Sequence, residues 1–392
     1  MNLRGNWNYP TTVRFGAGRI SELAACCREL GMQRPLLVTD SGLAEHAITK
    51  AAVAACKADG LDCGVFSDVS GNPTETQVEA GTAAFRAGGY DGVIAFGGGS
   101  GVDAAKAIAF MARQNRPIAD FEDIGDNWLR ATTENLVPVV AVPTTSGTGS
   151  EVGRASVITD ETAHRKRIIF HPTMLPRIAL SDPELTTGLP AGITAATGMD
   201  ALSHSMEAFF APFYHPFARG IAVEGMRLVK ENLATAVQDG GNIEARSHML
   251  AASQAGATAF QRGLGGMHAL AHTLGGLYNA HHGMLNAVLM PYVLSANRNA
   301  IADDAAYLAN CLGLKASLDG LIAWVLALRE EIGIPHTLAS LGIPGDQAEE
   351  VGRLAIEDPS AGGNPIALTP AQYQTIFECA LAGELPEPVA AA

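Results

Sequence analysis

The chain has 392 residues, which suits two ordinary domains or one large one, because domains usually span about 100–200 residues. Its 40 acidic and 26 basic residues give a net charge of −14, which argues against a nucleic-acid groove or an anionic membrane surface as the main partner. With 17% charged and 47% hydrophobic residues, the chain has material for a large core, and disorder and coiled coil are excluded as its main state.

The first half alternates short apolar runs with helical patterns. We expect buried strands near residues 35–40, 61–66, 92–96, 138–142 and 178–180. We expect helices over residues 43–59, 75–87 and 102–113. This alternation predicts βαβ units and a doubly wound parallel sheet of the nucleotide-binding type.

The pattern changes near residue 185. Residues 194–210, 216–238 and 243–260 carry apolar side chains at helical spacing, and extended β-branched runs are scarce there. Proline and glycine punctuate residues 189–193. We therefore predict an α/β domain over residues 1–185 and an all-α domain over residues 186–392.

Targeting signals are not evident. Residues 1–15 contain no apolar core of a signal peptide, and no apolar run approaches the ~20 residues of a membrane helix. The six cysteines form no CxxC pair. We expect a soluble, cytoplasmic protein with reduced thiols that binds neither membrane nor nucleic acid.

A glycine-rich loop, FGGGSGVDAAK at residues 96–106, follows an apolar strand and opens a helix. Glycines let the backbone approach a ligand closely, and the start of a helix presents N–H groups and a positive dipole end to an anion. A pyrophosphate suits such a place. Val102 stands where the third glycine of GxGxxG would be, so a tight strand-to-helix turn without a ligand remains the alternative.

A second polar loop, PTTSGTGSE at residues 143–151, also follows a buried strand, and Asp40 ends the first long one. Ligands of open α/β sheets lie beyond the carboxyl ends of the strands, so both loops and Asp40 are expected to line one crevice. A carboxylate there accepts hydrogen bonds from a ribose diol and repels a 2′-phosphate, which favours NAD over NADP. The alternative for Asp40 is a helix cap.

Histidines crowd into the helical half. Seven of the 11 fall within residues 204–282. Asp200 and His204 are four residues apart, as are His268 and His272, and such pairs share a helix face. Imidazoles with one carboxylate suit a divalent transition metal such as Fe, Zn, Co or Ni. Core or capping histidines are the alternative reading.

These motifs together resemble the iron-containing alcohol dehydrogenase family, which includes lactaldehyde reductases and butanol dehydrogenases. The resemblance runs along nearly the whole chain. The motifs that carry it are FGAG at 15–18, Asp40, GNPT at 71–74, the loops at 97–106 and 143–151, AATGMDALSH at 195–204, residues 268–272 and His282-Gly283.

The resemblance implies a Rossmann-like NAD-binding domain and a helical metal-binding domain of dehydroquinate synthase-like architecture, with the active site in the cleft between them. Metal ligands matched by position are Asp200, His204, His268 and His282, with Fe(II) expected and Zn(II) the alternative. Cofactor positions matched in the same way are Asp40, Asn72, Gly98, Gly99, Ser100, Asp103, Thr144, Thr145, Thr148, Lys166 and Leu185. His272 matches a histidine near the nicotinamide and substrate, and is the expected catalytic residue.

His281 departs from the family pattern, in which the residue before the last ligand is often proline. We expect a non-ligand role for it, although the doublet leaves open whether His281 or His282 binds the metal. The 14-residue separation from His268 favours His282.

The expected reaction is hydride transfer between NAD(H) and a small alcohol or aldehyde, with the metal polarising the substrate oxygen. His272 would relay the proton, because imidazoles titrate near neutral pH. Glycerol, diol and hydroxy-acid dehydrogenases or a maleylacetate reductase remain alternatives on the same fold, as does a non-catalytic sensor of dinucleotide and metal. We expect a homo-oligomer, with a dimer as the simplest form.

Overall fold

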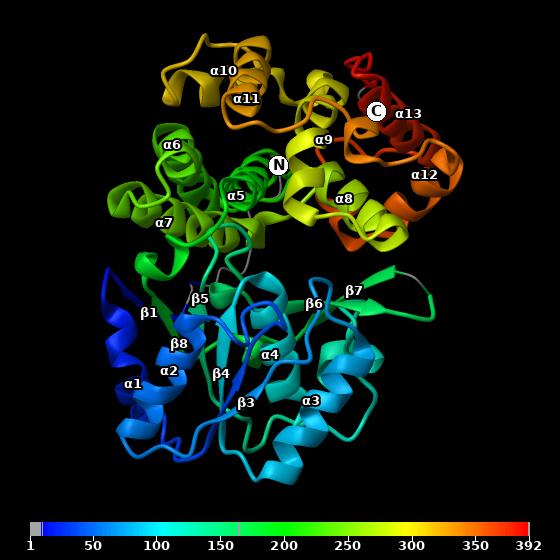
Figure 1. Cartoon of the computed structure of the whole chain (residues 1–392). Helices are drawn as coiled ribbons and strands as arrows, with labels where there is room; N and C mark the ends of the chain where they lie inside the picture. Colours follow the sequence, from blue (N-terminus) through cyan, green and yellow to red (C-terminus); the bar gives the residue numbers. More distant parts are fainter. Residues whose placement is uncertain (1–8, 10, 164, 391–392) are drawn as a thin grey trace. The chain divides into compact units, whose positions relative to one another are not determined.

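The computed structural model describes residues 9, 11–163 and 165–390. The chain divides into two compact units, an α/β unit of Tyr9–Gly188 and a helical unit that includes Leu189–Ala392 (Figure 1). The fold class expected from the sequence is confirmed: a parallel sheet with helices is followed by an all-helical unit.

The α/β unit is built on a parallel six-stranded sheet. In spatial order its strands are β1 (Thr12–Phe15), β8 (Ile178–Ser181), β5 (Val139–Pro143), β4 (Gly92–Gly97), β2 (Pro35–Val38) and β3 (Gly64–Phe66). The four strands β2, β4, β5 and β8 are buried at every residue, which is why they read as continuous apolar runs in the sequence.

Helices cover both faces of this sheet. Its helices are α1 (Leu23–Glu29), α2 (Ala47–Ala58), α3 (Glu75–Gly88) and α4 (Gly99–Met111). Alternate residues of the strands divide between two cores. One packs Leu36 and Val93 with α3 and α4, and the other packs Leu37 and Ile94 with α1 and α2.

Three features of this unit differ from the sequence expectations. Strand β1 and an antiparallel hairpin of β6 (Ala155–Asp160) and β7 (Arg165–Phe170) were not predicted. The helix expected from residue 43 begins at Ala47, because turns occupy residues 41–45 and His46 caps the helix by accepting from the Ile48 N–H.

The helical unit surrounds a single large core. Its helices are α5 (Ala191–Phe210), α6 (Pro216–Gln238), α7 (Ile243–Ala259), α8 (Gly266–Tyr278), α9 (His282–Ala296), α10 (Arg298–Cys311), α11 (Leu318–Glu331), α12 (Ala348–Glu357) and α13 (Pro370–Ala382). Helix α8 continues through Gly275 and Gly276 and ends where Asn279 takes a left-handed conformation, with φ of 51°.

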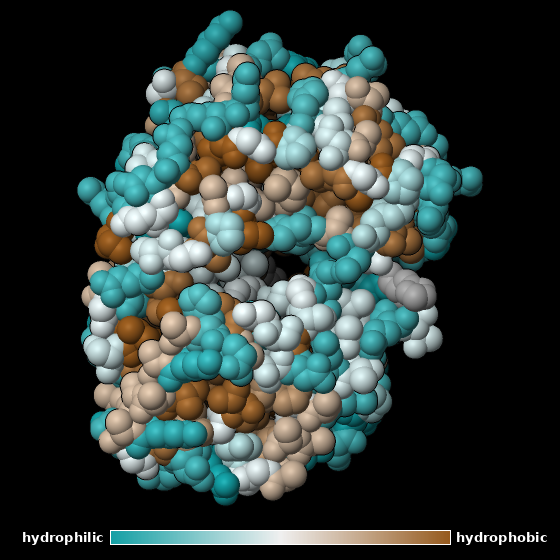
Figure 2. All heavy atoms as spheres, viewed as in Figure 1, coloured by the Kyte–Doolittle hydropathy of each residue, from teal (hydrophilic) through white to brown (hydrophobic). Residues whose placement is uncertain are grey.

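On the face seen in Figure 2, hydrophobic residues lie in small patches among hydrophilic ones. Among the described residues, none of the helices combines the length and the apolar character needed to cross a membrane.

Lys106 joins the sheet's helical layer to the hairpin. Its ammonium is almost completely buried, donates to the carbonyl oxygens of Ser150 (3.0 Å) and Ala155, and lies 3.2 Å from the Asp103 carboxylate. Burial lowers the pKa of Lys106, and Asp103 opposes that shift. Asp103 also accepts hydrogen bonds from the Ser150 hydroxyl and from the Val157 N–H (2.9 Å). The ion pair of buried Lys106 and half-buried Asp103 thus fixes the chain that follows β5.

Replacing this ammonium tests that role. We expect Lys106→Met to destabilise the α/β unit by roughly 3 kcal/mol, because it removes the buried cation that pairs with the half-buried Asp103 carboxylate and donates to two carbonyl oxygens. Urea unfolding followed by circular dichroism measures the change. Lys57→Met, at an exposed lysine, is the matched control and should leave the transition in place. Equal stability of the two variants would contradict the assigned role.

Candidate functional site

Four side chains from three helices converge inside the helical unit. Asp200 and His204 come from α5, His268 from α8 and His282 from α9, and one potential ligand atom of each lies within 4.8 Å of all the others. Three of the four residues are buried, and His282 is half-buried. The imidazole rings of His204 and His268 stack with their centroids 4.7 Å apart.

Helix α5 supplies two members of this cluster because of its spacing and its burial. Asp200 and His204 are one turn apart and so point from the same face. The helix is buried along almost its whole length after Thr194, as expected for a helix that is apolar nearly all round. Arg262 donates to the carbonyls of Ala208 (3.1 Å) and Phe209 at the end of the helix, where those acceptors lack partners within it.

A glycine brings α9 against α5. A Cβ atom on Gly283 would lie 2.5 Å from the Ala196 carbonyl oxygen and 3.2 Å from Cβ of Asp200. Only a residue without a side chain fits this contact between two backbones. The preceding residue, His282, is thereby carried to within 3.5 Å of the Asp200 carboxylate.

Glu207 orients His268 from behind. Its carboxylate is 2.6 Å from Nδ1 of His268 and accepts hydrogen bonds from the backbone N–H groups of Gly265 (2.8 Å) and Met267 (2.6 Å). The carboxylate therefore caps the start of α8 and keeps a proton on Nδ1, so that the lone pair of Nε2 faces the cluster. Burial lowers the pKa of His268, but the charge and hydrogen bond of Glu207 outweigh it, and the pKa is raised.

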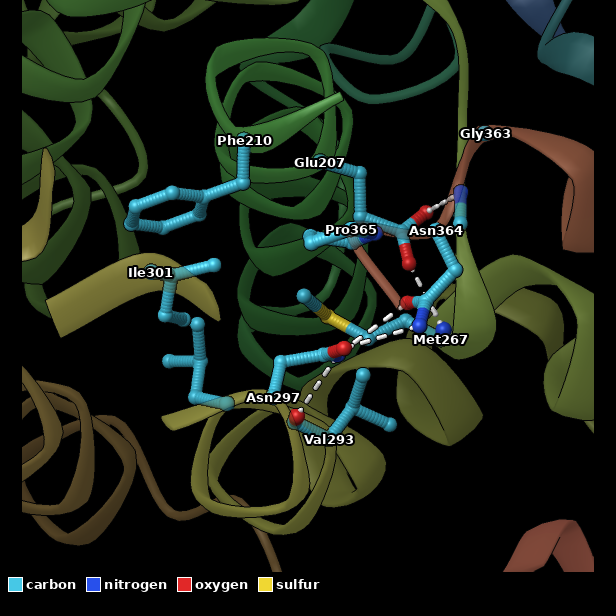
Figure 3. A pocket seen from close by; sticks show the side chains of 11 residues that line it. Glu207, Phe210, Met267, Val293, Asn297, Ile301, Gly363, Asn364 and Pro365 are labelled. Carbon is cyan, nitrogen blue, oxygen red and sulfur yellow. Dashed lines mark hydrogen bonds between the residues drawn. The ribbon is translucent and has the colours of Figure 1, made fainter. Parts of the chain in front are cut away.

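The close approach of Glu207 depends on glycine and on an amide pair. A Cβ atom on Gly265 would lie 3.1 Å from the Glu207 carboxylate. Asn364 accepts from the Gly266 N–H (3.1 Å) and exchanges hydrogen bonds of 3.0 and 2.8 Å with Asn297. Figure 3 shows Glu207 and this amide pair around a cavity of about 10 Å³, which has room for a single water molecule.

His272 lies beside the cluster with a carboxylate of its own. Its Nδ1 is 2.9 Å from Asp358, and its ring stacks on that of His282 with the centroids 5.1 Å apart. Burial raises the pKa of Asp358, but the charge and hydrogen bond of His272 and the hydrogen bond of the Ser360 N–H outweigh this effect. The pKa of Asp358 is therefore lowered, and the carboxyl stays ionised. The Asp358 carboxylate thus fixes which ring nitrogen of His272 carries the proton, as Glu207 does for His268.

His281 and His282 have different places. His281 is exposed and caps α9, accepting from the Met284 N–H at 3.4 Å, whereas His282 belongs to the cluster. The expected non-ligand position of His281 agrees with this geometry.

The donor set fits a divalent transition metal. Three imidazole nitrogens and one carboxylate oxygen meet inside a largely buried site, and one of these imidazoles, that of His268, has a carboxylate on its other nitrogen. This is the arrangement in which histidines present a fixed lone pair to an ion.

The α/β unit brings the expected cofactor loops together. Strand β2 lies between β3 and β4, so the strand order reverses at the β2–β4 pair, where ligands bind in such sheets. Asp40 follows β2 and the glycine loop follows β4. A Cβ atom on Gly97, which has φ of 148°, would lie 3.5 Å from the Asp40 carboxylate.

The threonine loop packs directly on the glycine loop. A Cβ atom on Gly98 would lie 3.1 Å from the Thr145 side chain, and one on Gly99 would lie 2.5 Å from that of Thr148. Ser100 donates its hydroxyl to the Gly71 carbonyl at 2.5 Å, which adds the segment containing Asn72. The two loops predicted to share a crevice are therefore in contact.

Other predicted cofactor residues have different surroundings. Asp103 is engaged by Lys106 and by the chain after β5, as described above. Leu185 is buried in the core that packs on α1 and α2. Lys166 is half-buried on β7, opposite Thr159. Thr144 is buried at the end of β5, and its N–H donates to the Gly97 carbonyl at 2.9 Å.

Asp40 also caps a turn, since its carboxylate accepts from the Leu43 N–H at 3.0 Å. The capping alternative is thus present in the structure, and one carboxylate oxygen is left over for another partner.

Sequence reasoning missed Glu207 and Asp358. Glu207 follows His204 by three residues and Asp200 by seven, so helical spacing places it on the same face and could have revealed it. Asp358 is 86 residues from His272, and no local pattern connects the two.

The chain matches two models of one family. A model described as iron-containing alcohol dehydrogenase matches residues 10–183, and one described as Fe-containing alcohol dehydrogenase family, C-terminal, matches residues 194–381.

Individual relatives agree with these matches. A 4-hydroxybutyrate dehydrogenase of Cupriavidus necator is 40% identical over 380 residues, covering 94% of this chain and 98% of the relative. A 1,3-propanediol dehydrogenase of Klebsiella pneumoniae is 37% identical, covering 91% and 93%. The crystal structure of a 1,3-propanediol oxidoreductase superposes with a TM-score of 0.91 at 35% identity, covering 96% of this chain and 100% of that one.

The Glu207 carboxylate offers a test of the site. We expect Glu207→Gln to weaken binding of Zn(II) or Co(II) by roughly 10–100-fold, because the amide cannot accept from all three donors and Nδ1 of His268 loses its anionic partner. Competition with a chromogenic chelator measures the affinity. Glu330→Gln, at an exposed glutamate, is the control and should bind as the wild type does. An unchanged affinity in Glu207→Gln would remove Glu207 from the site.

Proposed function

Because the chain belongs to the iron-containing alcohol dehydrogenase family and is an oxidoreductase of that family, we propose that it transfers a hydride between NAD(H) and a small alcohol or aldehyde. The observation that carries the proposal is the convergence of four ligand atoms within 4.8 Å, from three helices of the matched C-terminal region. The proposed ligands are Asp200, His204, His268 and His282.

The identities of the metal and the nucleotide rest on the family. Fe(II) is the proposed ion, and Zn(II) is the alternative because it binds such ligands more tightly than iron in the usual order. NAD is favoured over NADP by the carboxylate of Asp40, and a relative that is 33% identical is named as an NAD-dependent methanol dehydrogenase. We propose that the domain of residues 1–185 binds NAD and that of residues 186–392 binds the metal.

The proposed cofactor residues are those expected from the sequence, but we assign indirect roles to two of them, Asp103 and Leu185. The contacts of Gly98, Gly99 and Ser100 with neighbouring loops support a built cradle for the nucleotide. Asp103 would act by holding that cradle through Lys106, and Leu185 through the core that it shares with Phe96 and Val142.

In the proposed reaction, bound metal supplies Lewis acidity toward the substrate oxygen and NAD supplies hydride transfer. The chain's own residues do the rest. Glu207 holds the proton on Nδ1 of His268, so Nε2 is kept as a donor atom. Asp358 accepts from Nδ1 of His272 and leaves Nε2 of that ring able to take a proton from an alcohol and pass it on.

The proposed substrates are small alcohols, with diols and hydroxy acids as the second candidate class. The relatives named above act on 4-hydroxybutyrate and on 1,3-propanediol, both of which carry a second polar group, and this favours testing such substrates first. We also propose a cytoplasmic homo-oligomer, with a dimer as the simplest form, that acts on small molecules.

Two variants separate metal binding from proton transfer. We expect Asp200→Ala to lose metal and NAD-linked activity together. We expect His272→Ala to keep its metal and lower kcat by roughly 10²–10⁴-fold, because only the proton relay is removed. Metal analysis of anaerobically purified protein and NADH absorbance with 1,3-propanediol, 4-hydroxybutyrate and short primary alcohols measure both. Full activity in a chelated, metal-free preparation would overturn the mechanism.

Replacing Asp40 tests nucleotide choice. We expect Asp40→Asn and Asp40→Gly both to raise the kcat/KM ratio of NADP over NAD, because the charge that repels a 2′-phosphate is lost. The Asn variant keeps an acceptor for the Leu43 N–H and so separates charge from capping. Asp62→Gly, at an exposed aspartate, is the control. An unchanged ratio in both Asp40 variants would leave Asp40 with the capping role alone.

A further inference from the structure

We infer that Asn286 is a positioning residue of the metal centre, whose amide holds the Asp200 carboxylate in place for the ion. The inference rests on the proposed function, since it concerns the same four ligands. No motif in the sequence drew attention to this residue, and its contacts in the folded chain are what single it out.

Asn286 has no exposed surface and lies one turn after His282 on α9, on the same face. Its amide nitrogen is 2.9 Å from Oδ1 of Asp200, 3.1 Å from Nε2 of His282 and 3.3 Å from Nε2 of His268. One side-chain NH₂ group therefore touches three of the four proposed ligands. No other asparagine described in the structure has such a position.

The contacts cannot all persist when an ion binds. A ring nitrogen that gives its lone pair to a metal has none left for a hydrogen bond, so the contacts to Nε2 of His268 and of His282 would be lost as hydrogen bonds. The contact with Asp200 remains possible, because a carboxylate has about four lone-pair sites. Asn286 would then donate to the liganding carboxylate, which is how residues around a metal fix the direction of its ligands.

Without the ion, the same NH₂ group serves the ligands in another way. It places two partly positive hydrogens among a carboxylate and two imidazole nitrogens that would otherwise face one another with unshared electron pairs. The ligand atoms can stay close together before the metal arrives, and less rearrangement is needed on binding. The amide nitrogen must face inward for this, because an oxygen in its place would lie 2.9 Å from an anionic carboxylate oxygen.

The amide oxygen of Asn286 indicates that packing is not the role of this residue. Its Oδ1 is buried and has no hydrogen-bond partner among the described residues. An unpaired buried acceptor is unfavourable, so packing alone does not explain an amide at this position. The amide is accounted for by what its nitrogen contacts.

The test compares metal affinity with the stability of the metal-free protein. We expect Asn286→Leu to bind Zn(II) roughly 10–100-fold more weakly than the wild type by chelator competition. The visible absorption of the Co(II)-loaded variant should differ from that of the wild type, because the Asp200 oxygen is no longer held. The unfolding temperature of the metal-free variant should stay within about 4 °C of the wild type, since the lost hydrogen bond is offset by removal of the unpaired oxygen.

Two further variants serve as a control and as a second substitution at the site. Asn232→Leu removes an amide of the same kind that bonds only within α6, to the Leu228 carbonyl, and should leave metal affinity and spectrum unchanged. Asn286→Ser is the second variant at the site. Its hydroxyl is too short to span the distance to Asp200, so it should weaken Zn(II) binding even if the leucine variant does not fold.

The outcomes separate this inference from the proposed function. If the wild type binds no more Zn(II) than Asp200→Ala does, the metal centre itself is refuted. If the wild type binds the ion and the Asn286 variants bind it within threefold with the same Co(II) spectrum, only the inference is overturned. A fall of more than about 10 °C in the metal-free unfolding temperature would assign Asn286 a structural role and would also overturn it.

Discussion

A single buried carboxylate, that of Glu207, determines the geometry of the helical unit around the cluster. It belongs to the helix that carries Asp200 and His204, yet it accepts hydrogen bonds from the first turn of α8 and from His268. The start of α8 is thereby tied to α5 at the level of individual atoms. Because the same oxygens cap a helix and orient an imidazole, the packing of two helices and the direction of a ligand lone pair cannot vary independently.

The α/β unit follows the same logic with opposite charges. There a buried cation, Lys106, ties a helix to the loop that follows a neighbouring strand, and Asp103 balances its charge. The glycine and threonine loops meet just beyond these strands, with Gly99 and Thr148 in direct contact. In each unit a buried charged side chain holds polar groups in place. Lys106 holds the loop after β5, and Glu207 holds the start of α8 and the His268 ring.

Much of the architecture was predictable because local patterns carry it. Strands β2, β4 and β5 are apolar at every residue, and α5 to α7 have clear helical spacing, so their existence needed no distant information. The β6–β7 hairpin was missed because neither strand is a continuous apolar run: the buried positions of Ala155–Asp160 include Ser156 and Asp160, and Arg165–Phe170 begins with three basic residues. The start of α2 was misplaced because turns around residues 41–45 contain residues that also suit a helix.

The cluster itself was predictable from spacing and resemblance, but its support was not. Asp200 and His204 lie four residues apart in one helix, which a sequence displays. The partners of His268 and His272 are 61 and 86 residues away, and only the folded chain brings them together. Asn286 was equally hidden, although its four-residue distance from His282 is a helical spacing that could have been noticed.

The contact of Gly283 with the backbone of Ala196 has a consequence for how this protein can diversify. A substrate pocket is usually reshaped by exchanging side chains, which leaves the main chain in place. At residue 283, however, even one added carbon would push two helices apart and move His282 away from Asp200. The dimensions of the cluster are therefore set by a distance between two main chains, so variation in specificity has to occur around this fixed point and cannot pass through it.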